Sequence, residues 1–230
     1  MADENQYLPA LTGLWDSAVL VPVTEINELV LEILRGAAAA TTTAAATTTT
    51  TATASAATAC GELRLVSGLR ELWCALDDAA QQRLARCPYL LLDAGFAARE
   101  CWDGIALVSG VMDGAAPRGY FTSPAGIALV RRALVFAWHL ARSNRLTARV
   151  LLGMTAECAE RIAACALRDL EALAELCPSW VVPRWEAQPM IWRQLIQAAL
   201  GGHAAALWQV QLRGVQLLAA GSQRPGDRLG

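Results

Sequence analysis

Residues 145–186 read RLTARVLLGMTAECAERIAACALRDLEALAELCPSWVVPRWE, and this stretch decides the fold class. Apolar residues recur in it at helical spacing, in short runs that are separated by helix signals. Gly153 is a typical helix end, and Thr155 is a typical helix cap because its hydroxyl can accept a hydrogen bond from the first turn. Two prolines near the end of the stretch oppose helix there. The pattern predicts helices at about 147–152, from 155 onward and at 167–176, followed by an extended segment at 179–185.

The sequence on both sides of this stretch is also helical in pattern. Upstream, Ser123-Pro124 is an N-cap followed by proline at the first helical position, where its missing N–H costs nothing. Downstream, Gly201-Gly202 separates two apolar runs of helical length. We expect helices at about 124–143, 189–200 and 203–219, which make residues 124–220 one helical domain and residues 221–230 a disordered tail.

The first 123 residues read as mostly helical but match no family. Thr24 can cap a helix with an apolar stripe on one face, and Gly36 is expected to end it. A second stripe precedes Asp77 and Asp78, either of which can cap a further helix. The two stripes consist of Ile26, Leu29, Val30, Ile33 and Leu34, and of Leu65, Leu69, Leu72, Trp73 and Leu76.

A tract of Ala and Thr interrupts this half of the chain. Residues 37–59 contain only Ala and Thr apart from Ser55, so the tract has no large side chain to bury and is predicted to be disordered. Further on, clustered Gly, Asp and Pro indicate loops with one short strand at 105–108. The prediction is an all-α protein with an N-terminal segment (1–36), a linker (37–60), a helical and loop accessory region (61–123), the helical domain (124–220) and the tail.

Charge is distributed unevenly between the two halves. Residues 1–123 carry seven Arg and fourteen acidic residues, whereas residues 124–220 carry ten Arg and six acidic residues. The basic half is the better candidate for a phosphate-bearing partner; the alternative is that the two halves attract each other. The acidic start at residues 1–4 does not resemble a secretory signal, and the Ala/Thr tract lacks the large apolar residues of a membrane span. We expect a cytoplasmic protein with no membrane contact.

The stretch 145–186 resembles the central segment of FlhD, the DNA-binding subunit of a bacterial flagellar transcription activator. Similar helix lengths and order extend the resemblance to about residues 125–220. The shared features occur in order and without gaps. They are Leu152-Gly153 after a short helix, Glu157 and Ala159 in the next helix, Ala163-Ala164, Leu167, the helix end Leu173-Ala174-Glu175, and Arg184 between bulky residues and an acid.

The resemblance implies a homodimer that activates transcription together with a second, zinc-carrying FlhC-like subunit. The chain departs from the family in one stretch, where an aromatic-Arg-aromatic-acid pattern becomes Pro183-Arg184-Trp185-Glu186. The cysteine that is associated with linking two FlhD subunits corresponds to Val181, so only a non-covalent dimer is possible through this position. The N-terminal half has no counterpart in the family, which suggests a divergent relative.

The basic residues around Gly153 are the candidates for DNA contact. Residues 142–168 have the order of a helix-turn-helix variant, in which Arg142, Arg145, Arg149, Arg161 and Arg168 can meet phosphates. Arg145, Arg149 and Arg161 are the three main candidates. The resemblance adds Arg184 as a fourth candidate. The alternative is that these arginines are ordinary solvated residues, some of them paired with nearby acidic side chains.

Tryptophan is concentrated near the end of the chain and is a candidate for subunit contacts. Tryptophan buries a large area at small entropic cost and is enriched at interface hot spots; packing in the protein's own core is the alternative. The candidates are Trp180, Trp185, Trp192 and Trp208.

No residues suggest catalysis, a metal site or a cofactor. The seven cysteines lack the close pairs of structural zinc sites and are expected to be small buried apolar residues. His139 and His203 are not accompanied by the partners of a catalytic triad, and no phosphate-binding glycine motif is present. The sequence therefore predicts a DNA-binding transcription regulator. The alternative is a helical protein-interaction module without DNA binding, which the overall acidity favours.

Overall fold

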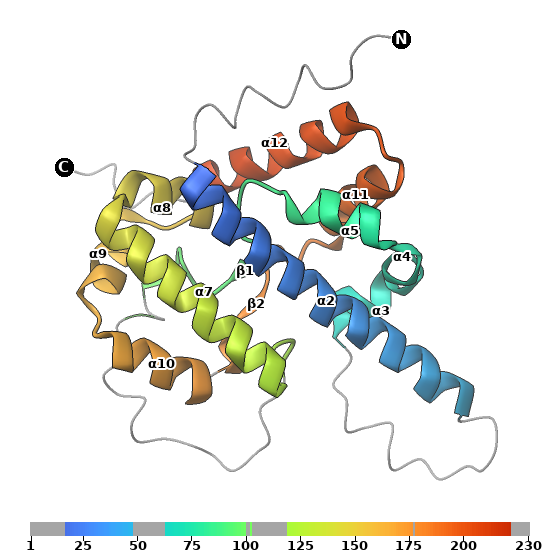
Figure 1. Ribbon diagram of the computed structural model, residues 1–230, viewed down its shortest axis with the longest axis horizontal. Helices are drawn as coiled ribbons and strands as arrows, with labels where there is room; N and C mark the ends of the chain where they lie inside the picture. Colours follow the sequence, from blue (N-terminus) through green and yellow to red (C-terminus); the bar gives the residue numbers. More distant parts are fainter. Residues whose placement is uncertain (1–16, 48–62, 100–101, 103–118, 177, 222–230) are drawn as a thin grey trace.

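The computed structural model describes residues 17–47, 63–99, 102, 119–176 and 178–221. Within these ranges it contains ten α-helices and one two-stranded sheet, so the predicted all-α class is confirmed (Figure 1). The elements are α2 (Ser17–Thr47), α3 (Arg64–Gly68), α4 (Arg70–Ala75), α5 (Asp78–Ala85), β1 (Leu92–Asp93), α7 (Pro124–Ser143), α8 (Arg145–Leu152), α9 (Ala156–Ala164), α10 (Leu167–Leu176), the 3₁₀-helix η2 (Pro178–Trp180), β2 (Val182–Pro183), α11 (Pro189–Leu200) and α12 (Ala204–Gly221).

Helix α2 is longer than the sequence predicts at both ends. It begins at Ser17 and not at Thr24, and it passes through Gly36 to Thr47. Gly36 is exposed and its φ is not positive, and Ala38 continues the buried stripe beyond it. The prediction of a linker is therefore wrong for residues 37–47, which belong to α2. Residues 48–60 of the tract lie outside the described residues.

The predicted stripe from Leu65 to Leu76 is buried, except that Leu72 is half-buried, but it spans two short helices and not one. The chain leaves the helical conformation at Leu69, which has φ −126° and separates α3 from α4. The predicted cap of the next helix is confirmed, because the Asp77 carboxylate accepts a hydrogen bond from the backbone N–H of Ala80 (2.6 Å). The strand predicted at 105–108 lies outside the described residues.

The helices predicted in the C-terminal half are confirmed with small shifts at their ends. Ser123 caps α7, with Pro124 in the first turn, and the side chain accepts from the backbone N–H of Gly126 (3.1 Å). Helices α10, α11 and α12 occupy the predicted ranges to within a few residues. The predicted extended segment contains η2 and then β2, which pairs antiparallel with β1.

The two halves of the chain share one hydrophobic core. Helices α2 and α7 pack side by side, α11 packs against α4 and α5, and α12 packs against α11 and α8 (Figure 1). The sheet also joins the halves, because Leu92 pairs with Pro183 and Asp93 with Val182. The buried apolar residues of all these elements form a single cluster. The described residues before the predicted boundary at residue 124 therefore share their core with the described residues after it.

Candidate nucleic-acid interface

Helices α8 and α9 form the helix–turn–helix that the sequence predicts. The Asn144 side chain caps α8 by accepting from the backbone N–H of Thr147 (3.0 Å), and Gly153 ends the helix in the left-handed conformation (φ +69°). Thr155 caps α9 by accepting from the backbone N–H of Cys158 (3.1 Å). Only three residues join the two helices, which is typical of helix–turn–helix motifs.

Segments from outside the motif hold its turn in place. The backbone N–H of Leu90 donates to the carbonyl of Leu151 (3.3 Å), and that of Thr155 donates to the carbonyl of Phe96 (3.3 Å). A Cβ at Gly153 would lie 2.8 Å from a methyl carbon of Leu218 on α12, so only glycine fits there without a shift. The motif is thus supported from both halves of the chain.

The predicted phosphate contacts on α8 and α9 lie at the surface, in different environments. Arg145 is exposed and pairs with Glu160 of α9 (3.4 Å). Arg149 is half-buried, and its Nε is buried without a hydrogen-bond partner among the described residues. Arg161 is exposed on α9. The Arg145–Glu160 pair agrees with the alternative that some of these arginines are paired with nearby acidic side chains.

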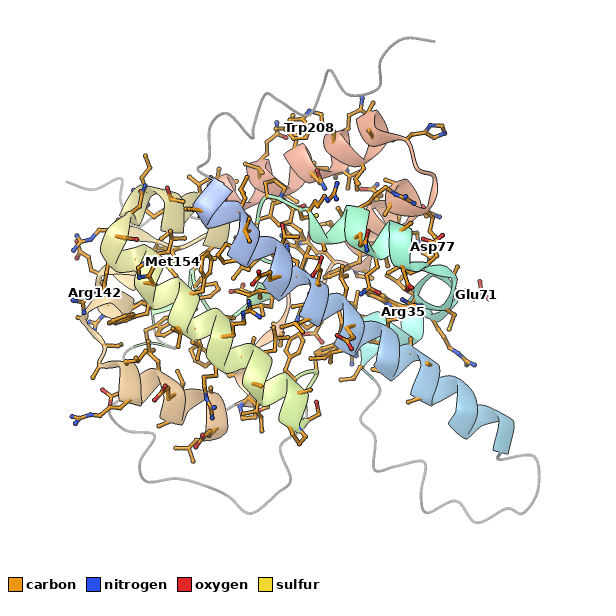
Figure 2. All side chains as sticks on the ribbon, viewed as in Figure 1. Arg35, Glu71, Asp77, Arg142, Met154 and Trp208 are labelled. Carbon is orange, nitrogen blue, oxygen red and sulfur yellow. The ribbon has the colours of Figure 1, made fainter. Side chains whose placement is uncertain are left out.

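The end of α7 carries Arg142, another of the arginines that the sequence predicts to contact phosphate. The guanidinium of Arg142 lies 4.7 Å from the ring centroid of Trp138, and Figure 2 shows it at the outer edge of the molecule. Trp138 in turn donates from its Nε1 to the carbonyl of Cys165, just after α9 (3.0 Å). Arg142, Arg145, Arg149 and Arg161 lie on α7, α8 and α9, which pack against one another; we call these four residues the basic surface.

Arg184 does not belong to the basic surface, and its predicted contact with phosphate is wrong. Only 3% of the residue is exposed. Its guanidinium donates to three backbone carbonyls, those of Leu90 (2.6 Å), Leu92 (2.9 Å) and Leu152 (3.0 Å). Burial lowers the pKa of this guanidinium, whereas Asp93 and Tyr89 raise it. The side chain of Arg184 points into the protein, where its acceptors are the carbonyls of Leu90, Leu92 and Leu152. A sequence motif does not reveal such backbone acceptors.

Three of the four tryptophans that were candidates for a subunit interface pack within the chain. Trp192 is fully buried with its ring centroid 5.4 Å from that of Trp73, so its assignment to an interface is wrong. Trp185 and Trp180 are half-buried, in edge contacts with Tyr89 (5.3 Å) and Trp102 (5.0 Å). The three rings pack against aromatic residues from distant parts of the chain, namely Trp73, Tyr89 and Trp102. Trp208 lies half-buried on α12, one turn before the exposed Leu212.

The cysteines differ in environment, and the described residues contain no group that could hold a metal. Cys87 and Cys158 are buried as predicted, whereas Cys74 is exposed. Burial raises the pKa of the Cys87 thiol to about 12, so this thiol stays protonated. Over the part of the chain that the structure describes, no three His, Cys, Asp or Glu side chains gather at a common point. Cys60, Cys101 and Cys177 lie outside that part.

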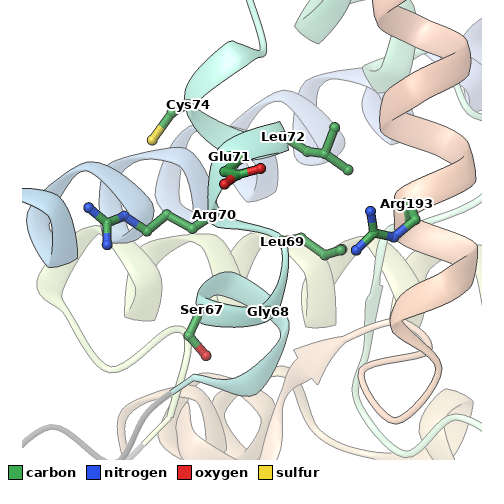
Figure 3. A pocket seen from close by; sticks show the side chains of 8 residues that line it. All are labelled: Ser67, Gly68, Leu69, Arg70, Glu71, Leu72, Cys74 and Arg193. Carbon is green, nitrogen blue, oxygen red and sulfur yellow. The ribbon is translucent and has the colours of Figure 1, made fainter.

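A shallow pocket of about 700 Å³ lies between the α3–α4 corner and α11. Arg70 and Arg193 line it, together with Glu71 and the exposed Cys74. Figure 3 shows the two guanidinium groups on opposite sides, with the carboxylate of Glu71 between them. The two cations therefore do not converge on one anion, and the pocket is a weaker candidate site than the basic surface.

Comparison with protein-family models, with curated proteins and with solved structures finds no significant match to this chain. Among the described residues, no helix is both long enough and apolar enough to cross a membrane. A function is therefore inferred from the chain's own residues and from their arrangement.

Proposed function

We propose that this protein is a non-catalytic, DNA-binding subunit of a transcription activator, similar to FlhD, and that it acts in the cytoplasm. One observation carries the proposal. Arg145 and Arg149 on the first helix of a helix–turn–helix and Arg161 on the second expose all or part of their side chains. The exposed part of such a side chain can contact a phosphate oxygen, whereas the covered Nε of Arg149 cannot. Arg145 lies one turn earlier on the same helix and can contact the neighbouring phosphate.

The charges around the motif support binding that is weak without a partner. The exposed face of α9 carries Glu157 and Glu160 beside Arg161, and the two acids repel phosphate. A second DNA-binding subunit would compensate for this repulsion by adding contacts of its own. We therefore include an FlhC-like partner in the proposal, and a homodimer in which Trp208 and Leu212 of α12 lie at the subunit contact.

The second candidate is a helical protein-interaction module, and one observation favours it. Glu157 pairs with Arg99 (3.2 Å) and Glu160 pairs with Arg145 (3.4 Å), so part of the positive charge is already neutralised within the chain. Glu25 of α2 likewise pairs with Arg132 of α7. The Glu25–Arg132 pair agrees with the alternative that the acidic and basic halves attract each other, although exposed ion pairs contribute little to stability.

Replacement of Arg145, Arg149 and Arg161 by Ala tests the proposal. With the partner present, the triple variant should bind specific and random duplexes more weakly by a similar factor, because phosphate contacts carry no sequence information. The slope of log K against log salt should fall by roughly one for each arginine–phosphate pair that the substitutions remove. The measurement is fluorescence anisotropy on labelled duplexes over a salt titration.

The matched control replaces Arg64, Arg70 and Arg86, which lie in the N-terminal half and change the net charge equally. Equal weakening by both triple variants would mean that only total charge matters. Wild-type binding by the first variant would favour the interaction module, as would no binding of the wild-type complex at any salt concentration.

Glu160→Gln provides a test in the opposite direction. The change removes a negative charge beside Arg145 and keeps the shape of the side chain, so DNA binding should tighten by several-fold at low salt. Glu171→Gln on α10 is the control, because Glu171 is exposed but lies on another helix. If both Glu160→Gln and Glu171→Gln bind DNA with the affinity of the wild type, α9 does not face the duplex.

A further inference from the structure

We propose that Arg184 is a positioning residue for the helix–turn–helix: it fixes the end of α8, and with it the angle at which the basic surface is presented. This inference rests on the proposed function only for its effect on DNA binding. Its structural part concerns the turn between α8 and α9, and that part can be tested without DNA.

The hydrogen bonds of Arg184 connect three separate parts of the chain. Its Nη2 donates both to the carbonyl of Leu152, the last residue of α8, and to that of Leu92 in β1. Its Nε donates to the carbonyl of Leu90. Its own backbone N–H donates to the carbonyl of Leu91 (2.8 Å), and its carbonyl accepts from the indole N–H of Trp192 (2.5 Å). Both the backbone and the side chain of Arg184 are therefore fixed.

The position next to the turn explains why this residue controls the motif. Leu152 directly precedes Gly153, and a Cβ added at Gly153 would lie 3.3 Å from Nη1 of Arg184. The carbonyls at the end of a helix lack intrahelical donors, and a cation there also interacts favourably with the helix dipole. Arg184 thus supplies the donor that ends α8 at Leu152 and allows the chain to enter the turn.

Arginine suits this position better than lysine. The planar guanidinium directs several N–H groups along fixed directions, so one side chain can reach three carbonyls at once. A lysine ammonium is a compact group on a flexible stem, and it cannot span the carbonyls of residues 90, 92 and 152 with the same geometry. A phosphate contact, by contrast, tolerates lysine because it requires mainly a positive charge. The substitution Arg184→Lys therefore separates the two roles.

The consequence is that the N-terminal half takes part in DNA binding without touching DNA. Residues 90–92 hold Arg184, Arg184 holds the end of α8, and α8 carries Arg145 and Arg149. Any change that shifts residues 90–92 should change the presentation of the basic surface. The family resemblance placed Arg184 at the DNA; the structure places it behind the motif.

The experiment compares Arg184→Lys with Arg83→Lys in the full chain. Arg83 is the matched control, because its Nε also donates to a carbonyl near the end of a helix, that of Ala199 in α11 (2.9 Å). Amide hydrogen exchange of the free protein should become about tenfold faster or more at residues 151–158 in Arg184→Lys, since removal of a buried hydrogen bond is worth about a decade in a local opening equilibrium. In Arg83→Lys, faster exchange should be confined to the end of α11.

Binding to a random duplex in the presence of the partner is the second measurement. Arg184→Lys should weaken binding by about tenfold although it retains the charge, whereas Arg83→Lys should bind like the wild type. Unchanged exchange at residues 151–158 in a folded Arg184→Lys protein would overturn the inference. Faster exchange there, with no DNA binding even by the wild type, would support the role at the turn and reject only the proposed function.

If Arg184→Lys does not fold, Gly153→Ala tests whether the turn between α8 and α9 is coupled to residues 90–92. The added methyl group meets Leu218 and Arg184 at a positive φ and changes no charge. Strain introduced at residue 153 reaches residues 90–92 only if the turn is coupled to them, so faster exchange at both residues 90–92 and residues 151–158 would support the inference. Faster exchange at residues 151–158 alone would overturn it.

Discussion

At the residue scale, the buried side chains of Asn27 and Arg184 form hydrogen bonds with backbone groups that have no partner in regular secondary structure. The chain between α5 and β1 crosses the core without regular structure, so its backbone groups need partners there. Asn27 of α2 accepts from the backbone N–H of Leu91 (2.8 Å) and donates to the carbonyls of Tyr89 (2.9 Å) and Ala85 (3.1 Å). Arg184 donates to the neighbouring carbonyls of Leu90 and Leu92.

The role of Asn27 predicts a large effect from a small substitution. Asn27→Ala should lower the free energy of unfolding by about 3 kcal/mol, because it leaves a buried N–H and two carbonyls without partners. Urea denaturation monitored by circular dichroism measures the change. Glu28→Ala, on the exposed side of the same helix, is the control and should stay within about 0.5 kcal/mol of the wild type. Equal effects at the two positions would mean that water replaces the amide of Asn27.

At the element scale, local signals were predictable from the sequence and long-range contacts were not. The caps at Asp77, Ser123 and Thr155 and the helix end at Gly153 were predicted correctly, because a cap is decided by residues within one turn. Gly36 carried the same local signal as Gly153, yet α2 continues through it because Ala38 packs in the core. Tertiary packing decided between two glycines that look alike in sequence.

The two glycines predict opposite effects of alanine. Gly36 lies inside a helix with no atom within 4 Å of an added Cβ, so Gly36→Ala should raise the free energy of unfolding by roughly 0.5–1 kcal/mol. Gly153→Ala should lower it, because Gly153 has φ +69° and touches Leu218. Thermal denaturation of both variants checks the pair. Destabilisation by Gly36→Ala would mean that α2 ends at Gly36 after all.

At the scale of the whole molecule, the predicted division into an accessory half and a DNA-binding half does not correspond to two separate hydrophobic cores. Composition and charge change between the halves, and from sequence alone residues 124–220 look able to fold by themselves as a helical dimer. In the structure, however, Trp192 packs on Trp73, and Arg184 bonds to Leu90 and Leu92. These contacts join residues about a hundred positions apart, so no pattern within either half could have revealed them. The same distance explains why Arg184 was placed wrongly at the DNA.

The shared core predicts that residues 124–220 do not fold when expressed alone. Without the first half, Trp192 is deprived of the ring of Trp73, and the guanidinium of Arg184 keeps only the carbonyl of Leu152. The fragment should show weak near-UV circular dichroism and no cooperative thermal transition, whereas the full chain shows both. Addition of residues 1–123 as a separate polypeptide should restore the near-UV signal of the tryptophans in a one-to-one complex, because the missing core residues are then supplied in trans. A fragment that unfolds cooperatively by itself, with a near-UV spectrum that the second polypeptide does not change, would show that the halves are independent domains and that Arg184 does not connect them.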